Sequence, residues 1–119
     1  MIYDCFMFFN EVPILEIRLN ELYDVVDKFI LIESETSHSG SYKPLYYNEN
    51  KLYFDKYKDK IIHEIIDLPN INGKSRREIE TIHRISILDI LKKYNVKDND
   101  IIISSDIDEI LYKNVLEKY

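Results

Sequence analysis

Several features that define common protein classes are scarce or absent in this sequence of 119 residues. It has two glycines, no tryptophan and one cysteine, Cys5. Two glycines cannot build the glycine-rich loops with which Walker and dinucleotide-binding motifs hold phosphate. A single cysteine cannot form an internal disulfide, and the apolar run around Cys5 predicts a buried thiol. We therefore expect a chain of the reducing cytoplasm that binds any phosphate group by other means.

Long apolar segments and basic charge are lacking as well. The longest apolar runs, such as residues 5–9 and 101–103, are far shorter than the ~20 residues that span a bilayer. The N-terminus leads directly into a strand pattern without a basic leader. The net charge is −6, which disfavours a nucleic-acid partner. We expect a single domain over residues 1–119, with no membrane segment and no nucleic-acid partner.

Apolar segments rich in β-branched residues and bounded by turn residues predict four strands. These are Ile2 to Phe9, Phe29 to Ile32, Ile61 to Ile66 and Ile101 to Ser104. The stretch from Ser34 to Asp59 predicts a loop followed by a short helix. Strands that alternate with helices favour an α/β fold with a mainly parallel sheet.

Two helical patterns separate these strands. Leucines at positions 15, 19 and 22 predict an amphipathic helix with Asn10 as its N-cap and Pro13 in its first turn. A longer helix is predicted from Ser75, which has capping-box spacing to Glu78, to about Tyr94. Apolar residues spread around much of its circumference, so we expect it to be buried on more than one side.

Ligands of such a fold bind beyond the carboxyl ends of the parallel strands. The four predicted strands end at residues 9–11, at residues 33–34, at Asp67 and at residues 105–109, and these are the candidate binding positions. Asn10, Glu11 and Glu33 lie where a doubly wound sheet meets the base and ribose of a nucleotide. Asn10 could instead cap its helix, and Glu33 could be a solvated loop residue.

The strongest local signal is the acidic cluster after the fourth strand, which contains Asp106, Asp108 and Glu109. In extended geometry, residues two apart point the same way, so Asp106 and Asp108 could share one divalent cation with phosphate oxygens and water. The alternative is that these carboxylates only cap a following helix. The sequence leaves both interpretations open.

Arg84 stands out because it falls between Leu88 and Leu91 on a helix face that otherwise looks apolar. A guanidinium group on such a face requires an anion. That anion could be a diphosphate bound at the strand ends, which suits the planar fork of arginine, or a neighbouring carboxylate of the protein.

Several segments, in order along the chain, resemble glycosyltransferase family 17. They are residues 1–11, residues 15–22, residues 29–34 with the following Thr36, Ser39-Gly40 and Lys43-Pro44-Leu45, and the motif Ser105-Asp106-Ile107-Asp108-Glu109-Ile110. The resemblance implies a GT-A-like, Rossmann-like domain and an inverting transfer of N-acetylglucosamine from UDP-GlcNAc to a glycan acceptor such as an N-glycan. It further implies Mn²⁺ or Mg²⁺ held by Asp106 and Asp108 of the Asp-x-Asp motif. Asn10, Glu11, Glu33, Arg84 and Asp106 are the expected donor-binding residues.

Departures from the family bear on activity. Family members continue beyond the Asp-x-Asp motif, whereas this sequence stops at Tyr119, so we expect the N-terminal part of the domain only, truncated after the Asp-x-Asp strand. The catalytic base is then unknown, with Glu109 as the one candidate. Ile85-Ser86 follow Arg84 where related enzymes more often carry asparagine.

Two alternatives to an active transferase remain. The first is a non-catalytic donor-binding module whose exposed sheet edge is covered by self-association or by a partner chain. The second is a phosphatase of the haloacid-dehalogenase type, with Asp106 and Asp108 as nucleophile and acid.

Overall fold

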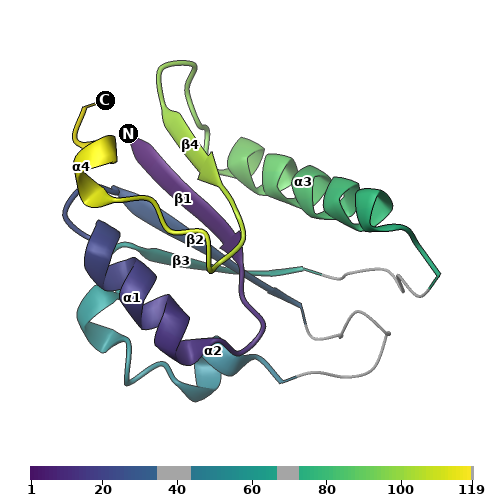
Figure 1. The fold of residues 1–119 in the computed structure, drawn as a ribbon, viewed down its shortest axis with the longest axis horizontal. Coiled ribbons are helices and arrows are strands. Elements are labelled where there is room, and N and C mark those ends of the chain that lie inside the picture. The colour runs from purple at the N-terminus through teal and green to yellow at the C-terminus, as the bar shows by residue number, and fades with distance from the viewer. Residues whose placement is uncertain (35–43, 67–72, 119) are drawn as a thin grey trace.

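Four parallel strands form the framework of the computed structural model, which describes residues 1–34, 44–66 and 73–118. In chain order the elements are β1 (Ile2–Met7), α1 (Val12–Leu22), β2 (Lys28–Ser34), α2 (Tyr46–Glu49), the 3₁₀ helix η1 (Asp55–Tyr57), β3 (Ile61–Ile66), α3 (Arg76–Lys93), β4 (Ile101–Ser104) and α4 (Lys113–Leu116) (Figure 1). Asp67 and residues 35–43 of the predicted loop lie outside the described residues.

The sheet has the strand order β3-β2-β1-β4, and every pairing in it is parallel. Cys5 of the central strand β1 lies opposite Ile30 of β2 and Ser104 of β4. The prediction of an α/β fold with a Rossmann-like parallel sheet is thus confirmed. All four predicted strands are present, and β3 and β4 have the predicted bounds.

Alternation along β1 divides the interior into two layers. Phe6 and Phe8 belong to the core beneath α1, whereas Cys5 and Met7 belong to the core beneath α3. This is the expected result of successive strand residues pointing to opposite faces. The first layer also contains residues of α1, α2, η1 and α4 and is therefore the larger one. Cys5 is fully buried, as predicted.

Helix α1 buries Leu15, Leu19 and Leu22 against the sheet, which confirms its predicted apolar face. The prediction that Asn10 caps this helix is wrong. The N-cap residue is Glu11, which makes no side-chain capping bond, and Asn10 has a positive φ of 122° in the turn before it. Asn10 lies one residue before the N-cap position, from which a side chain can accept a bond from the first turn.

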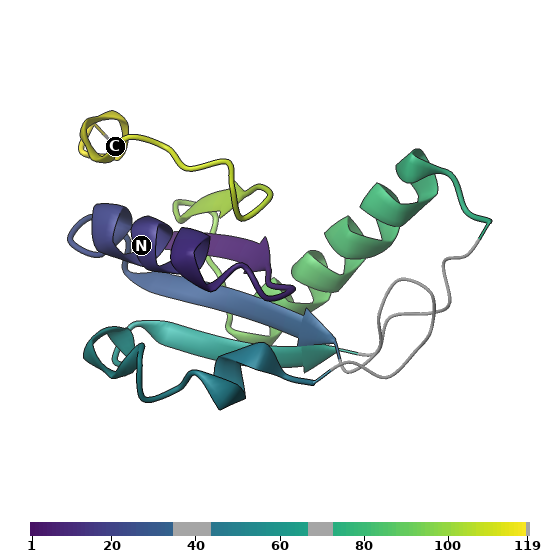
Figure 2. The same cartoon turned by 60° about the horizontal axis from the view of Figure 1, so that its bottom comes forward.

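Helix α3 begins with the predicted capping box, in which Ser75 and Glu78 exchange side-chain to backbone bonds. Its predicted burial on more than one side is wrong. Among its residues only Ile87, Ile90 and Leu91 are buried, while Ile85 and Leu88 are about half exposed. The helix contacts the sheet with one face of its C-terminal half, and its N-terminal half rises away from the strands (Figure 2).

None of the helices in the described part of the chain combines the length and the apolar character needed to cross a membrane.

Candidate functional site

A cleft lies at the carboxyl ends of β1 and β4, where parallel-sheet proteins bind ligands. It consists of two adjoining pockets of about 320 and 270 Å³, which share Met7, His83 and Asp106. The first pocket lies between α3 and the loop that follows β4. The second lies between that loop and the segment that joins β1 to α1. Of the residues of the loop after β4, Asp106 is the one that lines both pockets.

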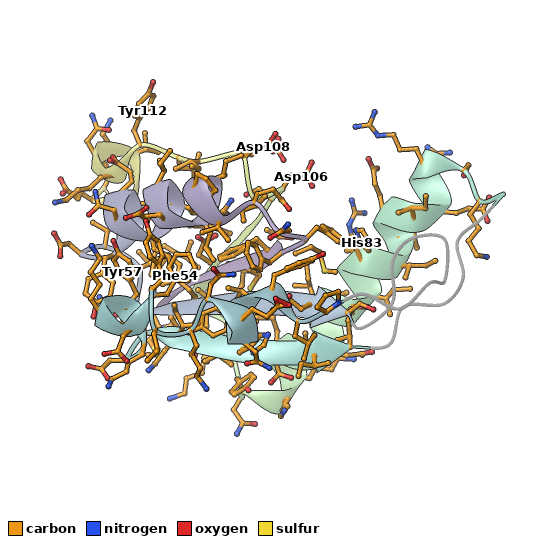
Figure 3. The ribbon with its side chains drawn as sticks, turned by 90° about the horizontal axis from the view of Figure 1, so that it is seen from below. Phe54, Tyr57, His83, Asp106, Asp108 and Tyr112 are labelled. Atoms are coloured by element: carbon orange, nitrogen blue, oxygen red, sulfur yellow. The ribbon has the colours of Figure 1, made fainter. Side chains whose placement is uncertain are left out.

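The loop after β4, residues 105–109, is named the acidic loop here. It is a turn, in which the Glu109 N–H donates to the Asp106 carbonyl (3.0 Å) and the Asp106 N–H donates to Glu109 Oε1 (2.9 Å). The predicted extended geometry of Asp106 and Asp108 is therefore wrong. Both side chains are nevertheless exposed and line the same pocket, because Ile107 between them is buried in the core. Figure 3 shows the two carboxylates side by side, with His83 of α3 across the cleft.

A buried arginine that the sequence analysis did not single out holds the acidic loop in place. Arg18 of α1 is fully buried, and its Nε and Nη2 atoms donate to the two carboxylate oxygens of Asp4 at 2.8 and 2.6 Å. Its Nη1 atom donates to the carbonyls of Asp106 (2.8 Å), Ile107 (3.2 Å) and Glu109 (3.3 Å). Nη2 also donates to Ser105 Oγ at 2.9 Å. All five N–H groups of the guanidinium thus have acceptors.

Asp4 of β1 is the anionic partner in this arrangement and is also fully buried. Burial raises the pKa of the Asp4 carboxyl, and the hydrogen bonds and positive charge of Arg18 oppose that rise. A sequence signal for this pair exists in retrospect. Asp4 interrupts the apolar run of β1, and Arg18 falls on the leucine face of α1. Two opposite charges on the apolar sides of neighbouring elements indicate a buried ion pair.

Helix α3 forms the opposite wall of the first pocket with Arg76, His83 and Arg84. Arg76 forms an ion pair with Glu80 at 3.5 Å. Arg84 is exposed and has no carboxylate partner among the residues that the structure describes. Of the two leucines that make the face around Arg84 look apolar in the sequence, Leu91 is buried and Leu88 is 52% exposed, so this face is only partly covered. Arg84 lines the first pocket, where its exposed side chain is accessible to a ligand.

The strand end after β1 contributes Glu11 but not Asn10. Glu11 lines the second pocket together with Asp106 and Asp108, and its Oε1 accepts a hydrogen bond from the Phe9 N–H at 3.1 Å. Asn10 is exposed and lines neither pocket. Within residues 1–34, 44–66 and 73–118, no three histidine, cysteine or acidic side chains come together as a metal-binding group.

Glu33, at the end of β2, is also absent from the lining of the cleft. Its side chain is fully buried, and its carboxylate accepts hydrogen bonds from the N–H groups of Tyr46 (2.8 Å) and Tyr47 (3.0 Å) at the start of α2. Oε1 also lies 2.9 Å from His63 Nε2. The interpretation of Glu33 as a solvated loop residue is therefore wrong, and its buried contacts indicate a role in anchoring α2.

Glu109 lines the first pocket, but its carboxylate closes the turn of the acidic loop by accepting from the Asp106 N–H. Its carbonyl oxygen accepts hydrogen bonds from Ser105 Oγ (3.2 Å) and from Arg18 Nη1. Much of Glu109 is therefore engaged within the loop itself.

An all-parallel sheet with helices on both faces and a polar cleft at its carboxyl edge defines an α/β protein with a Rossmann-like fold. Comparison with known protein families identifies the family to which this chain belongs. The family described as glycosyltransferase family 17 matches residues 1–118, so the chain belongs to glycosyltransferase family 17. It is a transferase that acts on a sugar donor and an acceptor. No curated protein and no solved structure gave a match.

Proposed function

We propose that this glycosyltransferase binds UDP-GlcNAc in the cleft and transfers N-acetylglucosamine, with inversion, to a glycan acceptor. The observation that supports this most directly is the composition of the cleft. The exposed carboxylate of Asp106 lines both pockets and that of Asp108 lines the second. The exposed arginines Arg76 and Arg84 of α3 line the first pocket, together with Glu80. A metal-bound diphosphate needs both kinds of group, since acidic side chains bind its cation and guanidinium groups bind its oxygens.

The residues present fit a divalent cation such as Mn²⁺ or Mg²⁺. Asp106 and Asp108 would supply two hard oxygen ligands, and phosphate oxygens and water would complete the coordination. When bound, the ion would offset the negative charge that develops on the departing diphosphate. Two protein carboxylates are enough for such a site, because cations that bind with a nucleotide take few ligands from the protein.

Arg84 is the residue of α3 best suited to bind the diphosphate. Its planar guanidinium group can donate two parallel hydrogen bonds to phosphate oxygens, and no described carboxylate competes for it. Arg76 already contacts Glu80 and would have to exchange that contact. Glu11 lines the second pocket with Asp108, which supports a role in accepting a hydrogen bond from a hydroxyl of the donor. Glu109 stays the candidate base, and its Oε1 accepts from the Asp106 N–H.

Isothermal titration calorimetry with UDP-GlcNAc, with and without Mn²⁺, tests this proposal. We expect Mn²⁺-dependent binding that the double variant Asp106→Asn/Asp108→Asn loses at least tenfold. Asp98→Asn, which removes an exposed carboxylate outside the cleft, should bind as the wild type does. Equal binding by the double variant and the control, or no binding by folded wild-type protein, would contradict the proposal.

A second pair of variants tests the arginine wall. Arg84→Gln should weaken UDP-GlcNAc binding at saturating Mn²⁺, whereas Arg77→Gln, an exposed arginine on α3 that does not line the cleft, should not. Release of UDP in the presence of a glycan acceptor then measures transfer. Binding without transfer would instead favour a donor-binding module that needs a second copy or a partner chain.

A further inference from the structure

We propose that Arg18 is a positioning residue for glycosyl transfer, which acts from inside the core by fixing the backbone of the acidic loop. This inference rests on the proposed role of Asp106 and Asp108 in donor binding. Arg18 itself is fully buried and lines neither pocket, so it cannot contact a donor directly.

The direction of the hydrogen bonds carries the inference. Arg18 Nη1 draws three carbonyls of the acidic loop inward, those of Asp106, Ile107 and Glu109. The Ile107 side chain is buried on the same side of the loop. With the carbonyls and Ile107 turned toward the core, the flanking side chains of Asp106 and Asp108 are left on the cleft side. One guanidinium group thereby sets the relative orientation of both carboxylates.

Asp4 fixes the orientation of that guanidinium group. It lies on the inner strand β1, where it is paired with Phe29 of β2 on one side and Ile103 of β4 on the other, so its backbone is fixed from both sides. The bidentate contact engages Nε and Nη2 and leaves Nη1 aimed at the loop. The Phe6 ring packs against the guanidinium, with Cζ 4.7 Å from the ring centroid. Together these contacts fix the plane of the guanidinium group and the direction in which Nη1 points.

A role in stability alone is a poor explanation for such a pair. Taking two charges into a protein interior costs several kcal/mol of desolvation per ion, and well-packed apolar replacements of buried pairs are often neutral or stabilising. What an apolar pair cannot do is hold three carbonyls and a hydroxyl in a set geometry. A lysine cannot do so either, because it offers three donors from a single point in place of a planar fork of five.

Two variants and one control test the inference. Arg18→Lys keeps the charge and loses the fork. Asp4→Leu/Arg18→Met removes both charges together, so that no unpaired buried charge is left to unfold the chain. Leu19→Met is the control, since it changes a fully buried neighbour on α1 while conserving volume. Urea unfolding first establishes that each protein is folded.

The first readout is the Mn²⁺ concentration required for half-maximal UDP-GlcNAc binding. We expect it to rise at least tenfold in Arg18→Lys and in Asp4→Leu/Arg18→Met, and to stay unchanged in Leu19→Met. Excess Mn²⁺ should restore donor binding to both Arg18 variants, because their carboxylates are present but misoriented. A folded Arg18 variant with the wild-type Mn²⁺ dependence would overturn the inference.

The second readout does not need a ligand. Hydrogen exchange at the amides of Asp106 and Glu109, which close the turn, should quicken at least tenfold in both Arg18 variants and not in Leu19→Met. If wild-type protein binds no donor while this exchange depends on Arg18, the proposed function fails and the positioning of the loop stands. If donor binding is normal in wild type and the exchange is insensitive to Arg18, the positioning role fails alone.

Discussion

Replacement of Glu33 by glutamine distinguishes most sharply between a structural and a ligand-binding role for a strand-end carboxylate. In the structure, Glu33 Oε2 accepts from Tyr46 N–H, and Oε1 accepts from Tyr47 N–H and contacts His63 Nε2. A glutamine side chain has a single acceptor oxygen. Whichever way the amide is turned, its NH₂ group then faces a buried donor, and at least one bond at the start of α2 is lost.

The expected cost follows from these contacts. A buried donor left without its acceptor costs about 1–3 kcal/mol. Loss of the charge also weakens the bonds that remain, since charge-assisted bonds are roughly twice as strong as neutral ones. We expect Glu33→Gln to lower the free energy of unfolding by about 2–4 kcal/mol. For a domain of this size that is a fall in Tm of roughly 8–16 °C.

Urea unfolding followed by circular dichroism measures this loss, with Glu49→Gln as the matched control. Glu49 lies on α2 but is exposed, so its replacement should change stability by less than about 0.5 kcal/mol. At temperatures where Glu33→Gln is folded, its donor affinity should equal that of the control. A variant as stable as Glu49→Gln with weakened donor binding would refute this reasoning and return Glu33 to the donor site.

Three further outcomes follow from the fold. Leu19→Ala should lower the free energy of unfolding by about 2–5 kcal/mol in urea titrations, because this side chain is fully buried. Ile17→Ala, on the exposed side of α1, should lower it far less. Equal losses would contradict the observed buried face of the helix. The Cys5 thiol, whose pKa burial raises to about 12, should be inert to a thiol reagent at pH 8 in folded protein and react fully in urea; fast labelling of folded protein would exclude the buried position. Ser75→Ala should destabilise the protein by about 1 kcal/mol, since it removes the acceptor of the Glu78 N–H at the start of α3, and an unchanged unfolding midpoint would mean that the capping box contributes nothing.

The fold was predictable to the extent that it depends on local pattern. The bounds of β3 and β4, the leucine face of α1 and the capping box at Ser75 all follow from residues close in sequence. The acidic loop was located for the same reason, as a polar cluster after an apolar strand. The extended geometry that its spacing predicts is absent, because the turn depends on the Glu109 side chain accepting from the Asp106 N–H.

The charged residues were harder to place. Arg84 stands out in the sequence as a charge among apolar residues. Its surroundings, however, depend on how far α3 covers the sheet, and the half-exposed Leu88 shows that this face is open. Glu33 looked like a ligand-binding carboxylate because strand ends often provide one. In the structure its carboxylate is buried and accepts hydrogen bonds from the backbone N–H groups at the start of α2, 13 and 14 positions further along the chain.

The sequence by itself determined the kinds of element, their order, the family and the position of the acidic motif, because each of these is encoded in short stretches of residues. The tertiary structure alone decided which charges are buried together and which line the cleft. Arg18 meets Asp4 across 14 positions and the Asp106 carbonyl across 88. Such partnerships arise only when the packing of α1 on the sheet excludes water, since a buried charge must then bind whatever polar groups the fold brings within reach.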